Sequence, residues 1–298
     1  MAKEYPETLL EFEHWFRTEE SCREYLIGLR WPRGFRCPAC GGGKAWVSRR
    51  LFLHCSQCRK DVSVTAGTVF HRTRIPLRAW FRAAWWLTNQ KNGINALGLQ
   101  RLLGLGSYET AWACLHKLRR AMVRPGRERL CGDVEVDEAF IGGVKRGSRG
   151  KLNKIPVAIA AEVRGSGIGR VRLKRLASIT SRGLQDFVEE AVDPGSRLVT
   201  DGWPAYRALR HHGYEHTPTT LDGRGKEAAS AILPRVHRIA SLLKRWLLGT
   251  YQGRITAKRL DRYLDEFAFR FNRRGSDRRG MLFYRLMQQC VAIEPGTY

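Results

Sequence analysis

The sequence predicts an α/β protein in which one larger domain follows two smaller modules. Three features lead to this prediction: two closely spaced cysteine pairs, a long stretch of helical periodicity after them, and strand-like runs that lead into alternating helix and strand. Such alternation is typical of α/β and α+β domains. The expected divisions are a helical segment at 1–30, a cysteine module at 31–72, a helical region at 73–128, the α/β domain at 129–285 and a tail at 286–298.

The composition restricts the class of partner. The chain has 298 residues, a formal net charge of +25 and 43% hydrophobic residues, enough to form a core. A charge this large repels itself unless a polyanion neutralises it, so nucleic acid is the expected partner before an anionic membrane. No stretch approaches the roughly 20 apolar residues that span a bilayer, and the N-terminus lacks the pattern of a secretory signal. We therefore expect a cytoplasmic protein that binds no membrane.

The cysteine module predicts a metal site. Four of the eight cysteines form two C-x2-C pairs with fourteen residues between them. Two such pairs let four thiolates close tetrahedrally on one zinc ion. An accidental pair of surface C-x2-C motifs or a redox dithiol is the alternative, but this spacing is typical of a zinc ribbon, and complete coordination indicates a structural Zn²⁺. The predicted ligands are Cys37, Cys40, Cys55 and Cys58.

The helical region contains a candidate helix-turn-helix. Residues 94–122 predict two helices separated by a glycine turn at 104–106, with Ser107 as the N-cap of the second helix. That second helix is a candidate for entering a DNA major groove, and a plain helical hairpin is the alternative. The candidate DNA-contacting residues are Lys117, Arg119 and Arg120. The expected small core is Leu97, Leu102, Leu105, Trp112 and Leu115.

The α/β domain begins after a linker rich in proline, glycine and arginine at 123–132. The expected elements are three strands in "DVEVDEAFIGG", "IPVAIAAEV" and "GRVRLKRLASI", a helix at about 180–192, a strand in "RLVTD", a helix at about 204–211, a polar loop at 221–230, and helices at about 234–248 and 256–271.

The first strand of this domain carries clustered acids. Asp133, Glu135 and Asp137 alternate with valines, so a period of two places all three on one face. Clustered carboxylates are costly unless they are solvated or coordinate cations, and a solvent-facing edge strand is the alternative. Asp201 ends the strand "RLVT", a frequent position for active-site residues in open α/β sheets. Two such acids can hold hard divalent ions, and a metal pair about 3.5–4 Å apart supports phosphoryl transfer.

Six motifs together resemble a known family. They are "CPAC…CSQC", "TAGTVFHRTRIPLRAWF", "VEVDEAFIGG", "VTDGWPAY", "LLKRWLLGTYQG" and "YLDEFAFRFNRR". In this order they resemble a bacterial insertion-sequence transposase with an N-terminal zinc ribbon and a DDE-type, RNase H-like catalytic domain. The resemblance implies that this domain is a mixed sheet with flanking helices. Within that group the chain is most similar to the fifteen-ninety-five insertion-sequence family, and the resemblance extends from about residue 20 to residue 285.

The resemblance implies both an activity and its residues. It implies a DNA transposase that binds the ends of its insertion sequence and catalyses metal-dependent strand cleavage and strand transfer. Asp137 would be the first catalytic acid and Asp201 the second, with Mg²⁺ or Mn²⁺, two ions in all, as the catalytic cofactor. The implied partners are terminal inverted repeats and target DNA, bound by a homodimer or higher oligomer.

The third catalytic position departs from the family pattern. It is expected on the long helix seven residues before Lys244, where this chain has His237 instead of glutamate. Seven residues are close to two helical turns, so both side chains share one face. Imidazole suits Mn²⁺, whereas Mg²⁺ prefers oxygen ligands. His237 could instead orient a phosphate or water, Glu227 in the preceding loop could supply a third carboxylate, or the chain could be an inactive copy.

The C-terminal helices concentrate positive charge. Residues 235–285 hold fourteen lysines and arginines against four acids, a net charge of +10. We expect Lys244 and Arg245 to contact DNA phosphates and this region to be a DNA-backbone surface, the alternative being a solvated helix face. For the whole chain, the alternatives to a transposase are a zinc-ribbon DNA-binding regulator and a structure-specific RNase H-like nuclease.

Overall fold

The computed structural model describes residues 3–48, 51–124, 126–142, 154–219, 232–252 and 255–295. The chain forms two compact units. Residues 1–124 with 276–298 form the first, here called the ribbon–helix unit, and residues 125–275 form the sheet unit. Within the described residues, no helix is long and apolar enough to cross a membrane.

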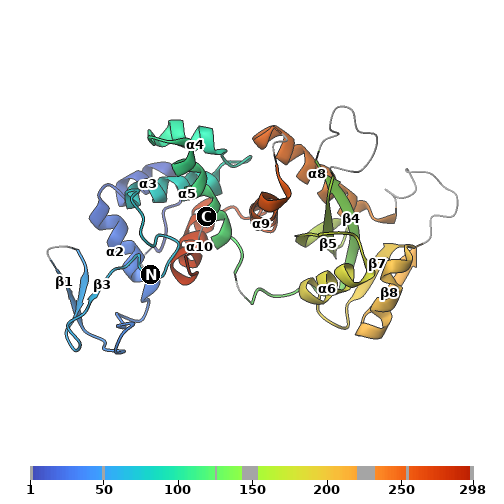
Figure 1. Ribbon diagram of the computed structural model, residues 1–298, viewed down its shortest axis with the longest axis horizontal. Helices are drawn as coiled ribbons and strands as arrows, with labels where there is room; N and C mark the ends of the chain where they lie inside the picture. The colour runs from blue at the N-terminus through green and yellow to red at the C-terminus, as the bar shows by residue number, and fades with distance from the viewer. Residues whose placement is uncertain are drawn as a thin grey trace. The chain divides into compact units, whose positions relative to one another are not determined.

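The ribbon–helix unit combines a small antiparallel sheet with a group of helices (Figure 1). The three strands, in the order β1-β2-β3, are Ala45–Val47, Leu53–Cys55 and Asp61–Val62. The helices are α1 Leu9–Trp15, α2 Glu19–Arg30, α3 Leu77–Asn89, α4 Ala96–Leu103, α5 Tyr108–Ala121 and α10 Arg279–Ala292. Thr18 caps α2, and its side chain accepts a hydrogen bond from the Ser21 backbone N–H at 3.1 Å.

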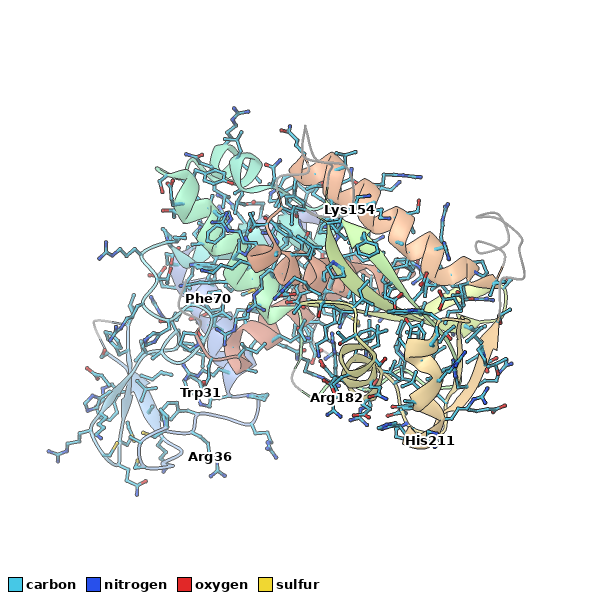
Figure 2. The ribbon with its side chains drawn as sticks, turned by 45° about the vertical axis from the view of Figure 1, so that its right-hand side comes forward. Trp31, Arg36, Phe70, Lys154, Arg182 and His211 are labelled. Atoms are coloured by element: carbon cyan, nitrogen blue, oxygen red, sulfur yellow. The ribbon has the colours of Figure 1, made fainter. Side chains whose placement is uncertain are left out.

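Aromatic side chains fill the helical part of this unit. Phe12, Phe81 and Phe283 are buried, and the Phe81 and Phe283 ring centroids lie 5.9 Å apart. Phe70, labelled in Figure 2, is fully buried with its ring centroid 5.3 Å from that of Trp80. Because large rings bury the most apolar area per residue, these contacts contribute strongly to the stability of the unit.

Helix α10 is the largest departure from the expected division of the chain. Residues 276–285 were expected in the α/β domain and 286–298 in a tail, whereas α10 packs against α2, α3 and α5 of the ribbon–helix unit. The Val69 N–H also donates to the Cys290 carbonyl at 3.0 Å. The helices that α10 contacts all lie before residue 122, far away in the sequence, so local periodicity could not locate them.

The sheet unit contains five strands in the order β6-β5-β4-β7-β8. Their bounds are β4 Asp133–Ile141, β5 Ile155–Arg164, β6 Gly167–Arg175, β7 Arg197–Asp201 and β8 Glu215–Thr219. Strands β4, β5 and β6 pair antiparallel, whereas β4, β7 and β8 run parallel. The edge strand β8 was not expected, because its sequence "EHTPT" contains a proline and no apolar alternation.

Helices cover both faces of this sheet. They are α6 Ser181–Ala191, the 3-10 helix η1 Pro204–His212, α8 Pro234–Tyr251 and α9 Ala257–Phe271. Val134 and Val136 of β4 share a core with residues of α6 and η1. Ala139 and Ile141 of the same strand share the opposite core with residues of α8 and α9. The expected mixed sheet with flanking helices is therefore confirmed.

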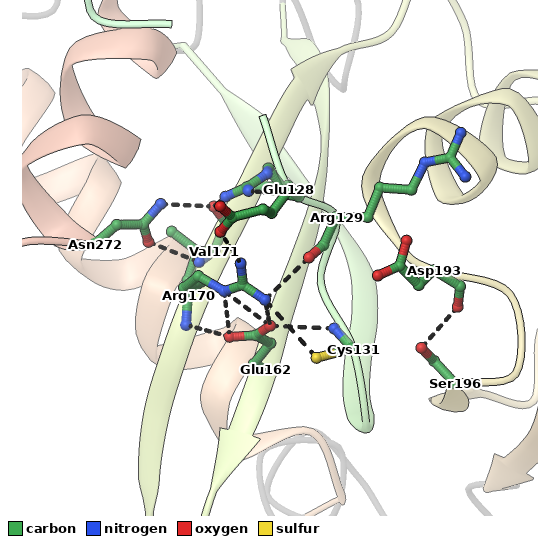
Figure 3. A network of polar contacts seen from close by, with 10 residues as sticks. Glu128, Arg129, Cys131, Glu162, Arg170, Val171, Asp193, Ser196 and Asn272 are labelled. Atoms are coloured by element: carbon green, nitrogen blue, oxygen red, sulfur yellow. Dashed lines mark hydrogen bonds and ion pairs between the residues drawn. The ribbon is translucent and has the colours of Figure 1, made fainter. Parts of the chain in front are cut away.

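A polar network fixes the start of the sheet unit (Figure 3). Arg170 of β6 donates to the Glu162 carboxylate of β5 at 2.6 Å and to the Arg129 carbonyl at 2.9 Å. Glu162 also accepts from the Cys131 N–H at 3.1 Å. Asn272 accepts from the Val171 N–H at 2.7 Å. These bonds tie the segment before β4 and the residue after α9 to β5 and β6.

Gly280 provides a test of the position of α10. A Cβ at this position would lie 1.7 Å from the Pro6 carbonyl oxygen, whereas a Cβ at Gly28 of α2 meets nothing within 4 Å. Gly280→Ala is expected to destabilise the ribbon–helix unit by about 1–3 kcal/mol through overpacking. Gly28→Ala, the control, should stabilise it by about 0.5–1 kcal/mol.

The measurement is denaturant unfolding followed by tryptophan fluorescence, because seven of the nine tryptophans lie in this unit. Equal stability of Gly280→Ala and Gly28→Ala would contradict the packing of α10 against the N-terminal segment.

Candidate metal centre and active site

The four predicted zinc ligands lie together in the ribbon–helix unit. The Cys37 and Cys58 sulfurs are 3.6 Å apart, as are those of Cys40 and Cys55, and all four ligand atoms lie within 4.8 Å of one another. A tetrahedron with Zn–S bonds of about 2.3 Å has sulfur–sulfur edges of about 3.8 Å, so the cluster fits one zinc ion. In the described part of the chain, it is the only group of three or more such side chains gathered this closely.

The backbone of the ribbon prepares two of these thiols for metal binding. The N–H of Ala39 lowers the pKa of Cys37 to about 6, and the N–H of Cys58 lowers the pKa of Cys55. A thiolate is the form that binds zinc, so less free energy is needed to deprotonate these two residues. The Gly42 N–H lowers the pKa of Cys40, but the neighbouring cysteines outweigh it and raise that pKa to about 12, so the last proton is lost at a greater cost. Beside the cluster, Trp31 packs against the ribbon core, and Arg36 is exposed (Figure 2).

The candidate helix-turn-helix has the expected turn but a different core. Gly104 adopts a left-handed conformation with φ 62° at the end of α4, and the Ser107 side chain accepts from the Thr110 N–H at 3.1 Å. Leu99 and Leu115 are buried, whereas Leu97 and Leu102, two of the expected core residues, are 46% and 44% exposed. The short helix α4 is apolar on more than one side, so its sequence did not determine which side packs.

Arg119 was expected to contact DNA, and the structure contradicts this expectation. Its side chain is 1% exposed and approaches the Ile94 carbonyl at 3.5 Å, so it does not lie on an accessible surface of the helix. Lys117 and Arg120 are partly exposed, and the Lys117 ammonium lies 6.0 Å from the Trp80 ring centroid. Their contact with DNA stays a prediction.

The three acids predicted to share one face of β4 have different surroundings. Asp133 accepts from Arg197 Nε at 2.8 Å, an exposed ion pair between neighbouring parallel strands. Glu135 is 2% exposed and accepts from Arg235 Nη1 at 2.8 Å. Asp137, the third acid, is not paired with an arginine in any of the described contacts. The alternative of a solvent-facing edge strand is therefore wrong, because β4 is the central strand of the sheet.

Asp137 faces α8, lies beside His237 and is within electrostatic reach of Asp201 and Lys244. Its Oδ2 is 3.5 Å from His237 Nε2. Burial raises the pKa of the Asp137 carboxyl, His237 and Lys244 oppose this effect, and the negative charge of Asp201 adds to it. The structure thus brings Asp137, Asp201, His237 and Lys244 into one electrostatic neighbourhood, although their ligand atoms are not gathered as tightly as those of the cysteines.

The remaining predicted site residues are on β7 and on α8, and one falls outside the described residues. Asp201 is the last residue of β7, and its Oδ1 accepts from the Trp203 N–H at 3.2 Å. Lys244 and Arg245 are exposed on α8. Glu227, the alternative third carboxylate, falls outside the described residues.

Sequence reasoning missed Glu138. It follows Asp137 but points to the opposite face of β4, where the Tyr206 hydroxyl donates to it at 2.6 Å. Burial raises the pKa of Glu138 to about 7, the Tyr206 hydrogen bond opposes this effect, and the charges of Asp137 and Asp201 add to it. Only the tertiary contact between β4 and η1 identifies this residue, although both motifs that supply it, "VEVDEAFIGG" and "VTDGWPAY", were visible in the sequence.

The zinc site predicts one tightly bound zinc ion per chain, measured by elemental analysis. Cys40→Ser removes one of four ligands and is expected to lose the ion. Cys131→Ser changes another exposed cysteine that lies outside the cluster and should retain it. Stoichiometric zinc in Cys40→Ser would contradict the four-cysteine site.

The raised pKa of Glu138 predicts a pH-dependent stability. Between the unfolded pKa of 4.5 and the folded pKa of about 7, the folded state binds more protons, so this group lowers stability as pH rises through that window. Glu138→Gln should therefore unfold at a higher temperature than the wild type at pH 8 without added divalent ions, and the difference should shrink at pH 5.

Glu190→Gln is the control, because Glu190 is an exposed partner of Lys174. The interpretation fails if Glu138→Gln shows no advantage at pH 8, or if the control shows the same pH-dependent advantage.

Two family models match this chain. Residues 129–272 match the ISXO2-like transposase domain, and residues 17–61 match the transposase zinc-ribbon domain. The chain is 26% identical over 277 residues to an uncharacterized protein in transposable element ISH50 of Halobacterium salinarum, with 86% of this chain and 91% of that protein covered.

Two solved structures are distantly similar. The Mos1 strand transfer complex matches with a TM-score of 0.31 and 15% identity, covering 71% of this chain and 77% of that one. A pre-cleavage Mos1 transpososome matches with a TM-score of 0.26 and 14% identity, covering 73% and 79%. The two family models match more than half of the chain between them, in the order ribbon and then transposase domain. The chain therefore contains a transposase zinc-ribbon domain followed by an ISXO2-like transposase domain.

Proposed function

We propose that this transposase binds the ends of its insertion sequence and catalyses metal-dependent DNA strand cleavage and strand transfer. The observation that supports the proposal most directly is the neighbourhood of Asp137, Asp201 and His237, which come from β4, β7 and α8. Two carboxylates whose charges repel each other in a partly buried place are disfavoured unless a cation or a proton compensates them. Their position is therefore suited to divalent metal ions.

The donor set fits Mg²⁺ or Mn²⁺. Aspartate oxygens suit both ions, whereas the imidazole of His237 favours Mn²⁺. When bound, such ions would supply the Lewis acidity that generates the attacking oxygen and neutralises charge on the phosphate. Asp137 and Asp201 would hold the ions, and His237 would complete the site. Lys244, on the same face of α8, would hold a DNA phosphate near Asp137.

The charge distribution supports DNA as the partner. Lys244 and Arg245 are exposed on α8, within a segment that has a net charge of +10. Lysine and arginine bind phosphates without reading sequence, so we assign this surface to the DNA backbone. Recognition of the terminal inverted repeats then belongs to the zinc ribbon and to the α4–α5 pair with Lys117 and Arg120. We propose a homodimer or higher oligomer on DNA, because cleavage and joining involve two ends.

The test separates cleavage from binding. Asp137→Asn and Asp201→Asn should each lower cleavage of terminal-repeat DNA by at least about 1,000-fold, since each removes a charged ligand for the ions. Binding to the same DNA, measured by gel shift, should change less than about threefold. Asp133→Asn is the matched control, because Asp133 is on the same strand but paired with Arg197, and it should cleave normally.

Full cleavage by both variants would contradict the proposed site. Binding without any cleavage by the wild type would favour a zinc-ribbon regulator. Cleavage that follows branch structure instead of terminal sequence would favour a structure-specific nuclease.

A further inference from the structure

The first turn of α8 is held by a carboxylate from another element. Leu233 precedes the helix without a side-chain cap, and Pro234 has no N–H. The next two backbone N–H groups, of Arg235 and Val236, both donate to Glu135 Oε2 of β4, at 2.7 Å and 3.0 Å. The His237 N–H begins the intrahelical pattern by donating to the Leu233 carbonyl. Glu135 thus satisfies the donors that the helix itself leaves unpaired.

The side chain of Arg235 completes this contact. Its Nη1 donates to Glu135 Oε1 at 2.8 Å, its Nε to the Gly167 carbonyl at 2.9 Å, and its Nη2 to the Gly165 carbonyl at 2.7 Å. The Glu135 side chain is 3% exposed and that of Arg235 is 19% exposed. The guanidinium therefore connects the helix start both to β4 and to the turn between β5 and β6.

This contact lies close in sequence to Asp137 and His237, two residues of the candidate catalytic site. Asp137 follows Glu135 by two residues on the same face of β4, and His237 follows Arg235 by two residues on α8. A helix held at Arg235 and Val236 cannot slide or rotate about its axis without breaking these bonds. The 3.5 Å approach of His237 Nε2 to Asp137 Oδ2 therefore depends on where Glu135 holds the helix.

We propose that Glu135 and Arg235 are positioning residues that hold His237 against Asp137. Neither is a catalytic residue, because both are fully engaged in holding the helix. The oxygens of Glu135 accept hydrogen bonds from the first residues of α8, and the guanidinium of Arg235 donates to Glu135 and to two carbonyls. They act by fixing α8, which carries both His237 and Lys244. The inference rests on the proposed function, since it assigns them to the same metal-dependent site.

The primary test is a double-substitution cycle on Mn²⁺ affinity, measured on the full chain with its zinc by electron paramagnetic resonance of free Mn²⁺. Glu135→Gln keeps the shape but removes the charge that orients α8, and it should weaken Mn²⁺ binding about 10-fold or more. In the His237→Ala background, the same substitution should weaken binding less than about threefold further, because its effect passes through His237.

Cleavage gives a second measurement. Glu135→Gln should lower the cleavage rate at saturating terminal-repeat DNA about 10-fold or more while leaving the KM for DNA within about threefold. Asp133→Asn, which breaks the other arginine–carboxylate pair of β4, is the matched control and should change neither Mn²⁺ affinity nor rate.

Arg235→Lys is the second variant if Glu135→Gln does not fold. It retains a cation beside Glu135 and both backbone bonds, but it loses the planar fork to the two carbonyls. A reduced Mn²⁺ affinity at an unchanged thermal midpoint would support the proposal. Wild-type affinity and rate in a folded Arg235→Lys or Glu135→Gln would overturn it.

The outcomes also distinguish this inference from the proposed function. Loss of activity in Asp137→Asn with normal activity in Glu135→Gln would reject the positioning role alone. Normal activity in Asp137→Asn would reject the metal site itself. If Glu135→Gln weakened Mn²⁺ binding equally in the wild type and in His237→Ala, the effect would be a general structural one, and the proposed coupling through His237 would be overturned.

Discussion

Three carboxylates on one face of the central strand β4 form the constraint on which most of the sheet unit depends. Each needs a partner, because an uncompensated charge within a sheet is costly. Asp133 takes Arg197 from β7, and Glu135 takes Arg235 together with the first turn of α8. Glu135 thereby attaches the long helix to β4, whereas the exposed pair of Asp133 lies beside a parallel ladder that already joins β7 to β4. Asp137 is left facing His237, with the like charge of Asp201 nearby.

The ribbon–helix unit depends on a different pair of interactions. Its small sheet has strands of only two or three residues and a core of a few side chains, so a metal tetrahedron would supply constraint that apolar burial cannot. Its helices are instead held by aromatic contacts, in which Phe283 of α10 takes part. A segment near the C-terminus thus completes a core that begins near the N-terminus.

Much of the fold could be predicted because its signals are local. Apolar residues recur with strand periodicity in the strand segments and with helix periodicity in "RGLQDFVEEA". Strands β4 to β7 and helix α6 lie where this periodicity predicts them. Strand β8 and helix α10 could not be predicted in this way. Strand β8 has no alternating apolar pattern, and the apolar surface of α10 packs on helices from a distant part of the chain. Arg119 was misassigned for a related reason, since a basic residue at the end of a helix gives no sign of burial.

The sequence by itself determined the ligand chemistry: two C-x2-C pairs, alternating acids on one strand, an aspartate at the end of another, and a histidine two turns before a lysine. Spacing along a single element carries that information because helix and strand have fixed periods. Only the tertiary structure decided which acids are already neutralised and which is left facing His237. Glu135 and Asp137 are equivalent in the strand pattern, and they differ because Arg235 and the unpaired N–H groups of α8 meet one of them and not the other.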